Sequence, residues 1–310
     1  RYLIMVKNAL EMQQVYKSYK KNEILQNVNF SIPQGAICGL IGENGAGKST
    51  IMKLIAGTSY VSSGSIYING KDVTQGNQEE RRNMGCLIEH PTIYKDMTAW
   101  ENLEIQRVMR GIPGRECIDE VLKAVDLQDA ANRKAGKYSL GMKQRLGIAI
   151  AMLGEPEFLI LDEPMNGLDP EKIHFIREFL LKRNKEYHTT ILISSHILEE
   201  LGHMATMYCF IHKGHILENI TKRELDERCR QHMDIRVNNI PQVCALLESR
   251  LKISEINVTD SGKIQLFEMM ENPEIISRCI VENGFDLYEL AMKQETLENY
   301  YMNLLVSADN

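Results

Sequence analysis

The fold class of this chain is decided by Gly42-Glu43-Asn44-Gly45-Ala46-Gly47-Lys48-Ser49-Thr50. The apolar residues 36–41 before it predict a strand, and residues 51–56 after it have the pattern of a helix. The three glycines permit backbone angles that a Cβ forbids, and they let backbone N–H groups approach phosphate oxygens. A strand, a glycine-rich loop and a helix N-terminus in this order predict a binding site for a nucleoside triphosphate.

Two side chains of this loop have expected roles of their own. Lys48 would reach the β- and γ-phosphates, and the Ser49 hydroxyl would bind Mg²⁺. The loop therefore predicts a nucleoside triphosphate and Mg²⁺ as the cofactors, bound by Gly42, Asn44, Gly45, Gly47, Lys48, Ser49 and Thr50.

A second motif is the apolar run 158–161, which ends on Asp162 and Glu163. Four consecutive apolar residues predict a strand that is buried on both faces of a parallel sheet. Asp162 would hold the Mg²⁺ shell. Glu163 would orient and polarise the attacking water as the general base. The alternative is a strand followed by a solvated acidic turn, and the upstream glycine-rich loop argues against it.

A third motif, Tyr138-Ser139-Leu140-Gly141-Met142-Lys143-Gln144-Arg145, lies between the other two. With its motifs in this order, the chain resembles the ATP-binding subunit of an ABC transporter from residue 9 to about residue 218. The resemblance implies roles for further residues: Tyr19 stacking on adenine, Ser139 and Gly141 meeting the γ-phosphate of ATP held by a partner subunit, Asp169 in the D-loop, and His196 as the switch histidine.

Two positions depart from the common pattern of that family. The signature reads Tyr-Ser-Leu-Gly-Met at 138–142 in place of Leu-Ser-Gly-Gly-Gln, and Glu89 stands where most members have glutamine. At both positions the sequence resembles the members of the subgroup that serves bacitracin and lantibiotic resistance or immunity. A carboxylate at position 89 would be a third metal ligand beside Ser49 and Asp162. The alternative is that Glu89 points to solvent or to a basic residue of a partner.

Composition agrees with a soluble cytosolic subunit, and the resemblance implies a place on the inner face of the cell membrane, without direct membrane insertion. The longest apolar stretch, 146–154, is too short to span a bilayer. Seven cysteines without a Cys-x-x-Cys pair favour reduced thiols. A net charge of −6 gives no electrostatic reason to expect nucleic acid as a partner.

The expected fold is α/β with two domains. Residues 5–218 would form the ABC ATPase domain, a P-loop core with an antiparallel β portion and a helical insert at about 96–152. In this insert, residues 98–101 form a capping box, and Ser139 is the expected N-cap of the signature helix. Residues 219–310 follow the order β-α-β-β-α-β, which predicts a small ferredoxin-like accessory domain.

The resemblance also implies the partners and the function. One glycine-rich loop and one signature cannot complete a site, so a second ATPase subunit is expected, as a homodimer or otherwise. The groove near 89–100 would receive a cytoplasmic helix of a polytopic membrane transport subunit; the alternative is that its apolar residues only pack in the core. The function expected is ATP hydrolysis that drives export or clearance of a peptide antibiotic. The alternative is a soluble ABC-type switch on ribosomes or in assembly, but its usual second cassette and basic linker do not occur in this sequence.

Overall fold

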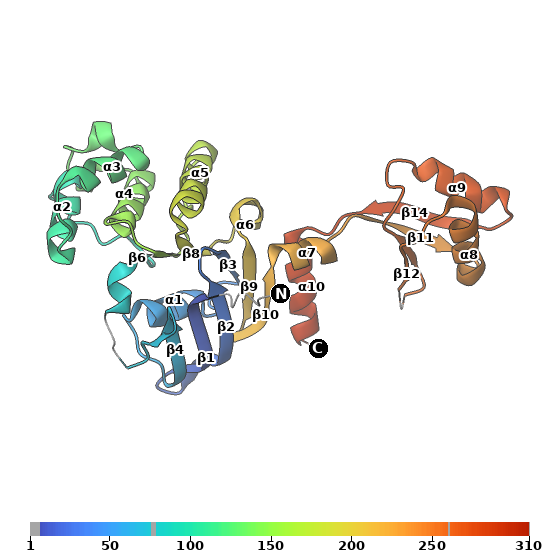
Figure 1. Cartoon of the computed structure of the whole chain (residues 1–310), viewed down its shortest axis with the longest axis horizontal. Helices are drawn as coiled ribbons and strands as arrows, with labels where there is room; N and C mark the ends of the chain where they lie inside the picture. Colours follow the sequence, from blue (N-terminus) through green and yellow to red (C-terminus); the bar gives the residue numbers. More distant parts are fainter. Residues whose placement is uncertain (1–6, 76–78, 260, 310) are drawn as a thin grey trace. The chain divides into compact units, whose positions relative to one another are not determined.

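The computed structural model describes residues 7–75, 79–259 and 261–309. The chain divides into two compact units (Figure 1). The first contains the described residues up to Lys222 together with Ser307–Asp309, and the second contains Arg223–Val306. The sequence predicted a division between residues 218 and 219. The expected start of the first domain, at residue 5, lies outside the described residues.

The first unit contains an antiparallel four-stranded sheet in the order β2-β1-β4-β5. Its strands are β1 (Asn8–Tyr19), β2 (Asn22–Pro33), β4 (Ser63–Ile68) and β5 (Lys71–Asp72). Asn69 and Gly70 both adopt positive φ, 50° and 78°, and they join β4 to β5 in a tight hairpin turn. This is the turn chemistry that an Asn-Gly pair favours.

A second sheet of this unit has six strands in the order β10-β9-β3-β8-β7-β6. Neighbours from β9 to β6 run parallel, and β10 is antiparallel to β9. Every residue of β3, β7, β8 and β9 is buried, which explains why these strands are mostly apolar; Thr190, Ser194 and His212 are their buried polar residues. The strands are β3 (Ile37–Ile41), β6 (Met84–Leu87), β7 (Phe158–Leu161), β8 (Thr190–Ser194), β9 (Met207–His212) and β10 (His215–Thr221).

The α-helices of the first unit are α1 (Lys48–Ala56), α2 (Ala99–Arg110), α3 (Glu116–Ala124), α4 (Leu140–Met152), α5 (Pro170–Tyr187) and α6 (Leu198–Met204). Short 3₁₀ turns occur at Glu80–Asn83, Gln128–Ala130 and Ala135–Lys137. Helix α1 packs through Ile51 and Leu54 into one core with side chains of both sheets, including Leu10 and Leu40.

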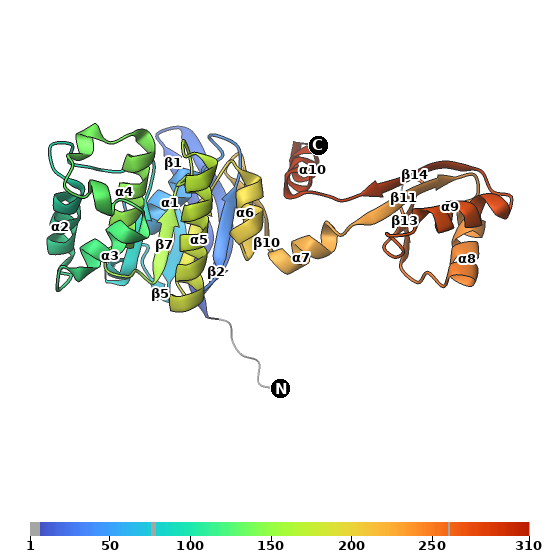
Figure 2. The same ribbon diagram turned by 90° about the horizontal axis from the view of Figure 1, so that it is seen from above.

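Helices α2, α3 and α4 pack together and form the predicted helical insert (Figures 1 and 2). Both caps expected there are confirmed. The Thr98 side chain accepts from the Glu101 N–H in a reciprocal capping box, and Ser139 accepts from the Met142 N–H at the start of α4.

The second unit folds as β11 (His232–Val237), α8 (Ile240–Leu251), β12 (Ile256–Val258), β13 (Ile264–Leu266), α9 (Pro273–Glu282) and β14 (Leu287–Lys293). The strand order β12-β13-β11-β14, with all pairs antiparallel, confirms the ferredoxin-like prediction. Its core joins strand residues such as Met233 and Ile235 to Val243 and Ile276 of the helices. Helices α7 (Lys222–Arg228) and α10 (Leu297–Asp309) flank this fold in the sequence.

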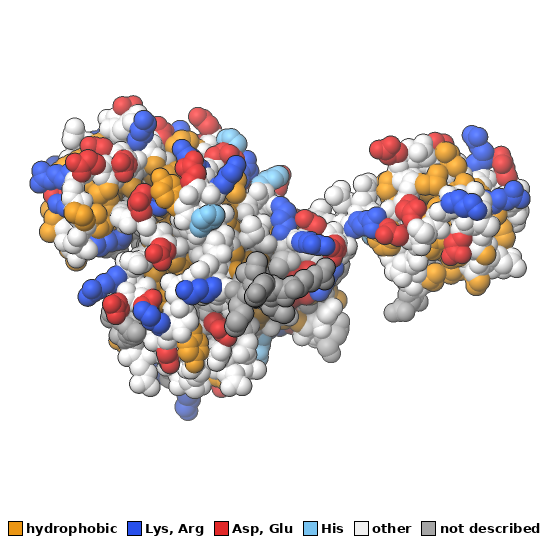
Figure 3. Space-filling view, viewed as in Figure 1, with side chains coloured by type: hydrophobic (Ala, Val, Ile, Leu, Met, Phe, Trp, Pro, Cys, Tyr) orange, Lys and Arg blue, Asp and Glu red, His pale blue; other side chains and the backbone are white. Residues whose placement is uncertain are grey.

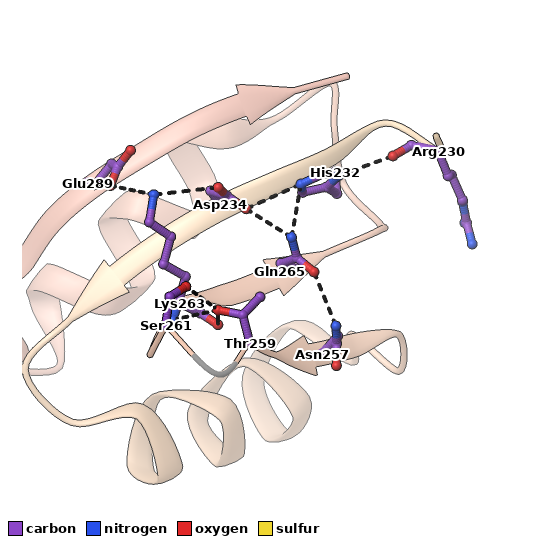
Figure 4. Close-up of polar contacts among 9 residues, drawn as sticks. All are labelled: Arg230, His232, Asp234, Asn257, Thr259, Ser261, Lys263, Gln265 and Glu289. Atoms are coloured by element: carbon purple, nitrogen blue, oxygen red, sulfur yellow. Dashed lines mark hydrogen bonds and ion pairs between the residues drawn. The ribbon is translucent and has the colours of Figure 1, made fainter. Parts of the chain in front are cut away.

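The sheet face opposite α8 and α9 carries a polar network (Figure 4). Gln265 Nε2 donates to Asp234 Oδ1 at 3.3 Å and lies 3.1 Å from His232 Nε2. Lys263 Nζ lies 3.6 Å from Asp234 and 3.1 Å from Glu289. These side chains satisfy one another, so this face is stable in water without a covering layer.

Charged side chains of both signs are interspersed on the faces of the units seen in Figure 3. In the described part of the chain, none of the helices combines the length and apolar character needed to cross a membrane.

Candidate functional site

The glycine-rich loop connects β3 to α1 and needs glycine at two positions for steric reasons. A Cβ at Gly42 would lie 2.6 Å from the Ile211 carbonyl oxygen. Gly47 has φ 113°, and a Cβ there would lie 2.6 Å from Leu25 Cδ2. The loop therefore closes tightly, and its backbone N–H groups lead into the N-terminus of α1.

Lys48 is buried at the first position of α1. Its Nζ donates to the carbonyl oxygens of Gly42 at 2.6 Å and Glu43 at 3.2 Å. The ammonium group thus lies over the loop, where an anionic ligand would gain a charge-assisted hydrogen bond.

A cavity of about 500 Å³ opens beside this loop. Nine of the predicted site residues line it: Asn44, Gly45, Gly47, Lys48, Ser49, Thr50, Glu89, Asp162 and Glu163. Ile24, Glu43, His90 and Asn166 complete the lining. The two acidic motif residues and the glycine-rich loop, more than a hundred positions apart in the sequence, therefore share one cavity.

Asp162 and Glu163 follow the end of β7 and are held differently. Asp162 is buried, and its Oδ1 accepts a hydrogen bond from Ser194 Oγ at 2.6 Å. Glu163 adopts φ 48°, a left-handed conformation that is rare for a non-glycine residue. Its backbone N–H donates to Ser194 Oγ at 2.9 Å, and its carbonyl accepts from Gln144 Nε2 at 3.2 Å.

His196 contacts the Glu163 carboxylate directly. The ring Nδ1 lies 2.7 Å from Glu163 Oε2, and the His196 backbone N–H donates to the same oxygen at 3.2 Å. The histidine side chain is 56% exposed and lies beside the cavity lining, which it contacts through Glu163. The predicted pair of Glu163 and His196 is therefore brought together.

The signature residues lie outside this cavity. Ser139 caps α4, and a Cβ on Gly141 would lie 3.0 Å from Leu168 of the D-loop. Asp169 caps α5 by accepting from the Lys172 N–H at 2.9 Å. Leu140, between the two signature residues, is 67% exposed.

Tyr19 is also outside the cavity lining. It ends β1 and is 48% exposed, and Lys17 Nζ lies 4.5 Å from its ring centroid. Its hydroxyl lies 3.2 Å from Ser59 Oγ.

Glu89 lines the cavity, but its carboxylate is engaged by a lysine. Oε1 lies 2.5 Å from Lys53 Nζ, and the Glu89 backbone adopts φ 61°. Lys53 in turn lines a second cavity of about 320 Å³, together with Ile88, Pro91 and Arg110. This ion pair therefore stands between the two cavities.

Comparison with known proteins gives the family. The family model described as ABC transporter matches residues 25–166. The chain is 37% identical over 289 residues to the bacitracin transport ATP-binding protein BcrA of Bacillus licheniformis, covering 93% of this chain and 94% of that protein. The chain belongs to the ABC transporter family. It is also 44% identical to the lantibiotic transport ATP-binding protein SrtF of Streptococcus pyogenes, over 67% of this chain and 89% of that protein.

Solved structures of ABC cassettes agree with this assignment. An ATP-binding subunit of an ABC transporter superposes with a TM-score of 0.65 at 30% identity, covering 71% of this chain and 92% of that one. A dimeric ATP-binding cassette bound to ADP and Pi also gives a TM-score of 0.65, at 25% identity, covering 69% of this chain and 99% of that one. The chain is thus an ABC-type ATPase that binds and hydrolyses ATP.

Sequence reasoning missed four contacts of this ABC ATPase, made by three residues. Ser194 touches both acidic residues, Gln144 touches the Glu163 carbonyl, and Lys53 pairs with Glu89. A signal was present for Ser194, because it is a hydroxyl at the end of an apolar run, two positions before His196. The contacts of Lys53 and Gln144 depend on packing between distant segments.

Proposed function

We propose that this chain is the ATP-hydrolysing subunit of a membrane transporter that exports or clears a peptide antibiotic of the bacitracin or lantibiotic type. The observation that carries the proposal is the extent of the similarity to BcrA. It covers 93% of the chain, so it runs beyond the cassette into the second unit. Relatives of this kind act on bacitracin or a lantibiotic according to their names, and the substrate class is inferred from them.

The proposed site is completed by a second ATPase subunit. Ser139 and Gly141 lie outside the cavity of their own chain, and the neighbouring Leu140 exposes a large apolar side chain. The signature residues are therefore proposed to act on the ATP of a second cassette and not on that of their own chain. The similar cassette that is dimeric with ADP and Pi bound supports a two-subunit assembly.

Each site residue then has a role in hydrolysis. The loop residues Gly42, Asn44, Gly45, Gly47 and Thr50 would surround the phosphates, and Tyr19 would stack on adenine. Lys48 would place its charge on the β- and γ-phosphates, and Glu163, oriented by His196, would accept a proton from the attacking water. Ser139 and Gly141 of the partner would stabilise charge on the γ-phosphate. Asp169 would support the D-loop between the subunits.

The chemistry of the cavity fits Mg²⁺. Among the described residues, neither the Ser49 hydroxyl nor Oδ2 of Asp162 has a side-chain hydrogen-bond partner. Both are oxygen donors of the kind that Mg²⁺ prefers, so they would hold the ion. When bound, the ion would neutralise charge that develops on the transferred phosphoryl group.

Glu89 is proposed as a third metal ligand whose access is controlled by Lys53. Glu89→Gln should raise the Mg²⁺ concentration needed for half-maximal activity, because an amide oxygen carries no charge. Lys53→Met should lower it, because the Glu89 carboxylate would lose its competing partner. ATPase assays across Mg²⁺ concentrations measure both shifts, with Lys182→Met on α5 as the control. Equal midpoints in all four proteins would remove Glu89 from the metal site.

The cavity lined by Lys53 and Arg110 is the proposed docking site for a cytoplasmic segment of a polytopic membrane subunit. It carries apolar residues such as Ile88 and Pro91 beside the basic Arg110. The protein would then work in the cytoplasm, peripheral to the inner face of the membrane. Nucleic acid is not among the proposed partners.

Co-expression with a polytopic membrane protein encoded beside this chain tests the function. We expect the two to purify together, and cells that contain both to survive more bacitracin or lantibiotic than cells with Lys48→Ala. Arg110→Glu should reduce co-purification, whereas Lys123→Glu on the exposed face of α3 should not. If the wild-type protein sediments with ribosomes and does not co-purify with the membrane protein, the proposal is overturned in favour of a soluble switch.

We also propose that residues 219–310 act as an accessory domain to the cassette at 5–218. The ferredoxin-like fold has its own core of strand and helix residues, including Ile235, Leu247 and Ile280. The polar side chains described on its sheet face pair with one another, and we propose a regulatory role for this domain.

A further inference from the structure

The Ser194 hydroxyl joins the two acidic residues that follow β7. Ser194 ends β8 and is fully buried, with 0% exposure. Its Oγ donates to Asp162 Oδ1 at 2.6 Å and accepts the Glu163 backbone N–H at 2.9 Å. One hydroxyl therefore contacts both Asp162, the proposed metal ligand, and Glu163, the proposed general base.

Sheet register brings this hydroxyl to its position. β7 and β8 are parallel neighbours with Leu161 opposite Ile193. The residues that follow this pair, Asp162 and Ser194, therefore lie at the same edge of the sheet. Ser194 follows the apolar run 191–193. An apolar side chain in its place would leave the Glu163 N–H and one oxygen of Asp162 without these partners, which is costly for buried groups.

The backbone of Glu163 gives a second reason for the contact. A non-glycine residue at φ 48° is strained and persists only where its surroundings hold it. Ser194 holds the amide of this turn, while His196 holds the carboxylate at the other end of the residue. The direction of the Glu163 carboxylate thus depends on the Ser194 hydroxyl.

We propose that Ser194 is a positioning residue for ATP hydrolysis. It fixes Asp162 through one carboxylate oxygen and leaves the other oxygen for the metal, and it holds the turn that directs Glu163 at the attacking water. The inference rests on the proposed function, because Mg²⁺ and water are the groups that Asp162 and Glu163 would serve. The competing explanation is that the hydroxyl only completes hydrogen bonding at a buried strand end.

Ser194→Ala tests the proposal, with Thr190→Val as the matched control. Thr190 is a buried hydroxyl residue of the same strand, and its Oγ1 accepts from the Gly35 N–H at 3.0 Å, away from the cavity. Binding of Mn²⁺ to the ATP-loaded full chain, followed by electron paramagnetic resonance, reports on the metal site without turnover. ATP affinity in EDTA, the melting temperature and the turnover rate complete the comparison.

We expect Ser194→Ala to weaken Mn²⁺ binding by about tenfold and to slow turnover by about 10- to 100-fold, as is typical when a residue that orients a ligand is lost. ATP affinity in EDTA should stay at the wild-type value. Ser194→Thr, which restores a hydroxyl, should lie closer to wild type than Ser194→Ala. Thr190→Val should keep wild-type Mn²⁺ binding.

Two outcomes would overturn the role of Ser194. Unchanged Mn²⁺ binding and turnover in Ser194→Ala would show that the hydroxyl orients nothing, and an equal loss in Thr190→Val would assign the effect to packing. If Ser194→Ala does not fold, Ser194→Cys, with a weaker donor, enters the same comparison. Failure of the proposed function would appear separately, as a wild-type chain that does not bind Mn²⁺ with ATP.

Discussion

Glu163→Gln is expected to bind ATP with wild-type affinity and to hydrolyse it about 10² to 10⁴ times more slowly, because the amide cannot accept the proton of the attacking water. The substitution keeps the size of the side chain, and the contacts of the Glu163 backbone with Ser194 and Gln144 remain available. ATP binding is measured by equilibrium titration, and hydrolysis by phosphate release.

A slowed Glu163→Gln variant should also accumulate as an ATP-bound dimer, because the bridging phosphate persists. Size-exclusion chromatography with ATP and Mg²⁺ should show the dimer in this variant and less of it in the wild type. Glu186→Gln, at an exposed position near the end of α5, is the control and should hydrolyse ATP normally. A Glu163→Gln variant that stays monomeric with ATP, alone and with its membrane partner, would contradict the two-subunit site.

Local chemistry explains why so much of this fold could be predicted from the sequence. The glycine-rich loop is defined by neighbouring residues, and so are the caps at Thr98 and Ser139. The apolar run 158–161 predicts a strand buried on both faces, because both faces of a parallel sheet are covered and neither is exposed to water. Each of these features is decided within about ten residues of chain.

Contacts between distant segments could not be predicted from the sequence, and the reason is physical. The ion pair of Lys53 with Glu89 joins α1 to the segment after β6, across 36 positions. The bond between Ser194 and Asp162 spans 32 positions and depends on the register of β8 against β7. No local pattern encodes such a register, since it emerges only when the sheet assembles.

The same distinction applies within the candidate site. The sequence grouped Lys48, Asp162 and Glu163, whose expected roles come from their motifs, and all three line one cavity. It did not predict that the Glu89 carboxylate would be engaged by a lysine of α1. A motif predicts which residue type is present at a site, whereas the partner of that residue is set by packing.

Lys48→Ala should lower ATP affinity by about 10- to 100-fold, the effect expected when a hydrogen bond from a charged donor is lost. Lys48 Nζ lies over the loop and donates to the carbonyl oxygens of Gly42 and Glu43. Without it, the β- and γ-phosphates would lose their point charge, and the two carbonyl oxygens would lose their donor. Turnover should fall to the background of the assay, because the developing charge on the γ-phosphate would also lose this stabilisation.

Lys48→Met separates the charge from the packing of the side chain. It keeps an apolar stem at a buried position but removes the ammonium group, so it should lose ATP binding to the same extent as Lys48→Ala. Isothermal titration with ATP measures both variants, and Lys182→Ala on the exposed surface of α5 should bind as the wild type does. If Lys48→Met bound ATP normally while Lys48→Ala did not, the lysine would act by filling space beside the loop. Equal losses in the two variants would assign the effect to its charge.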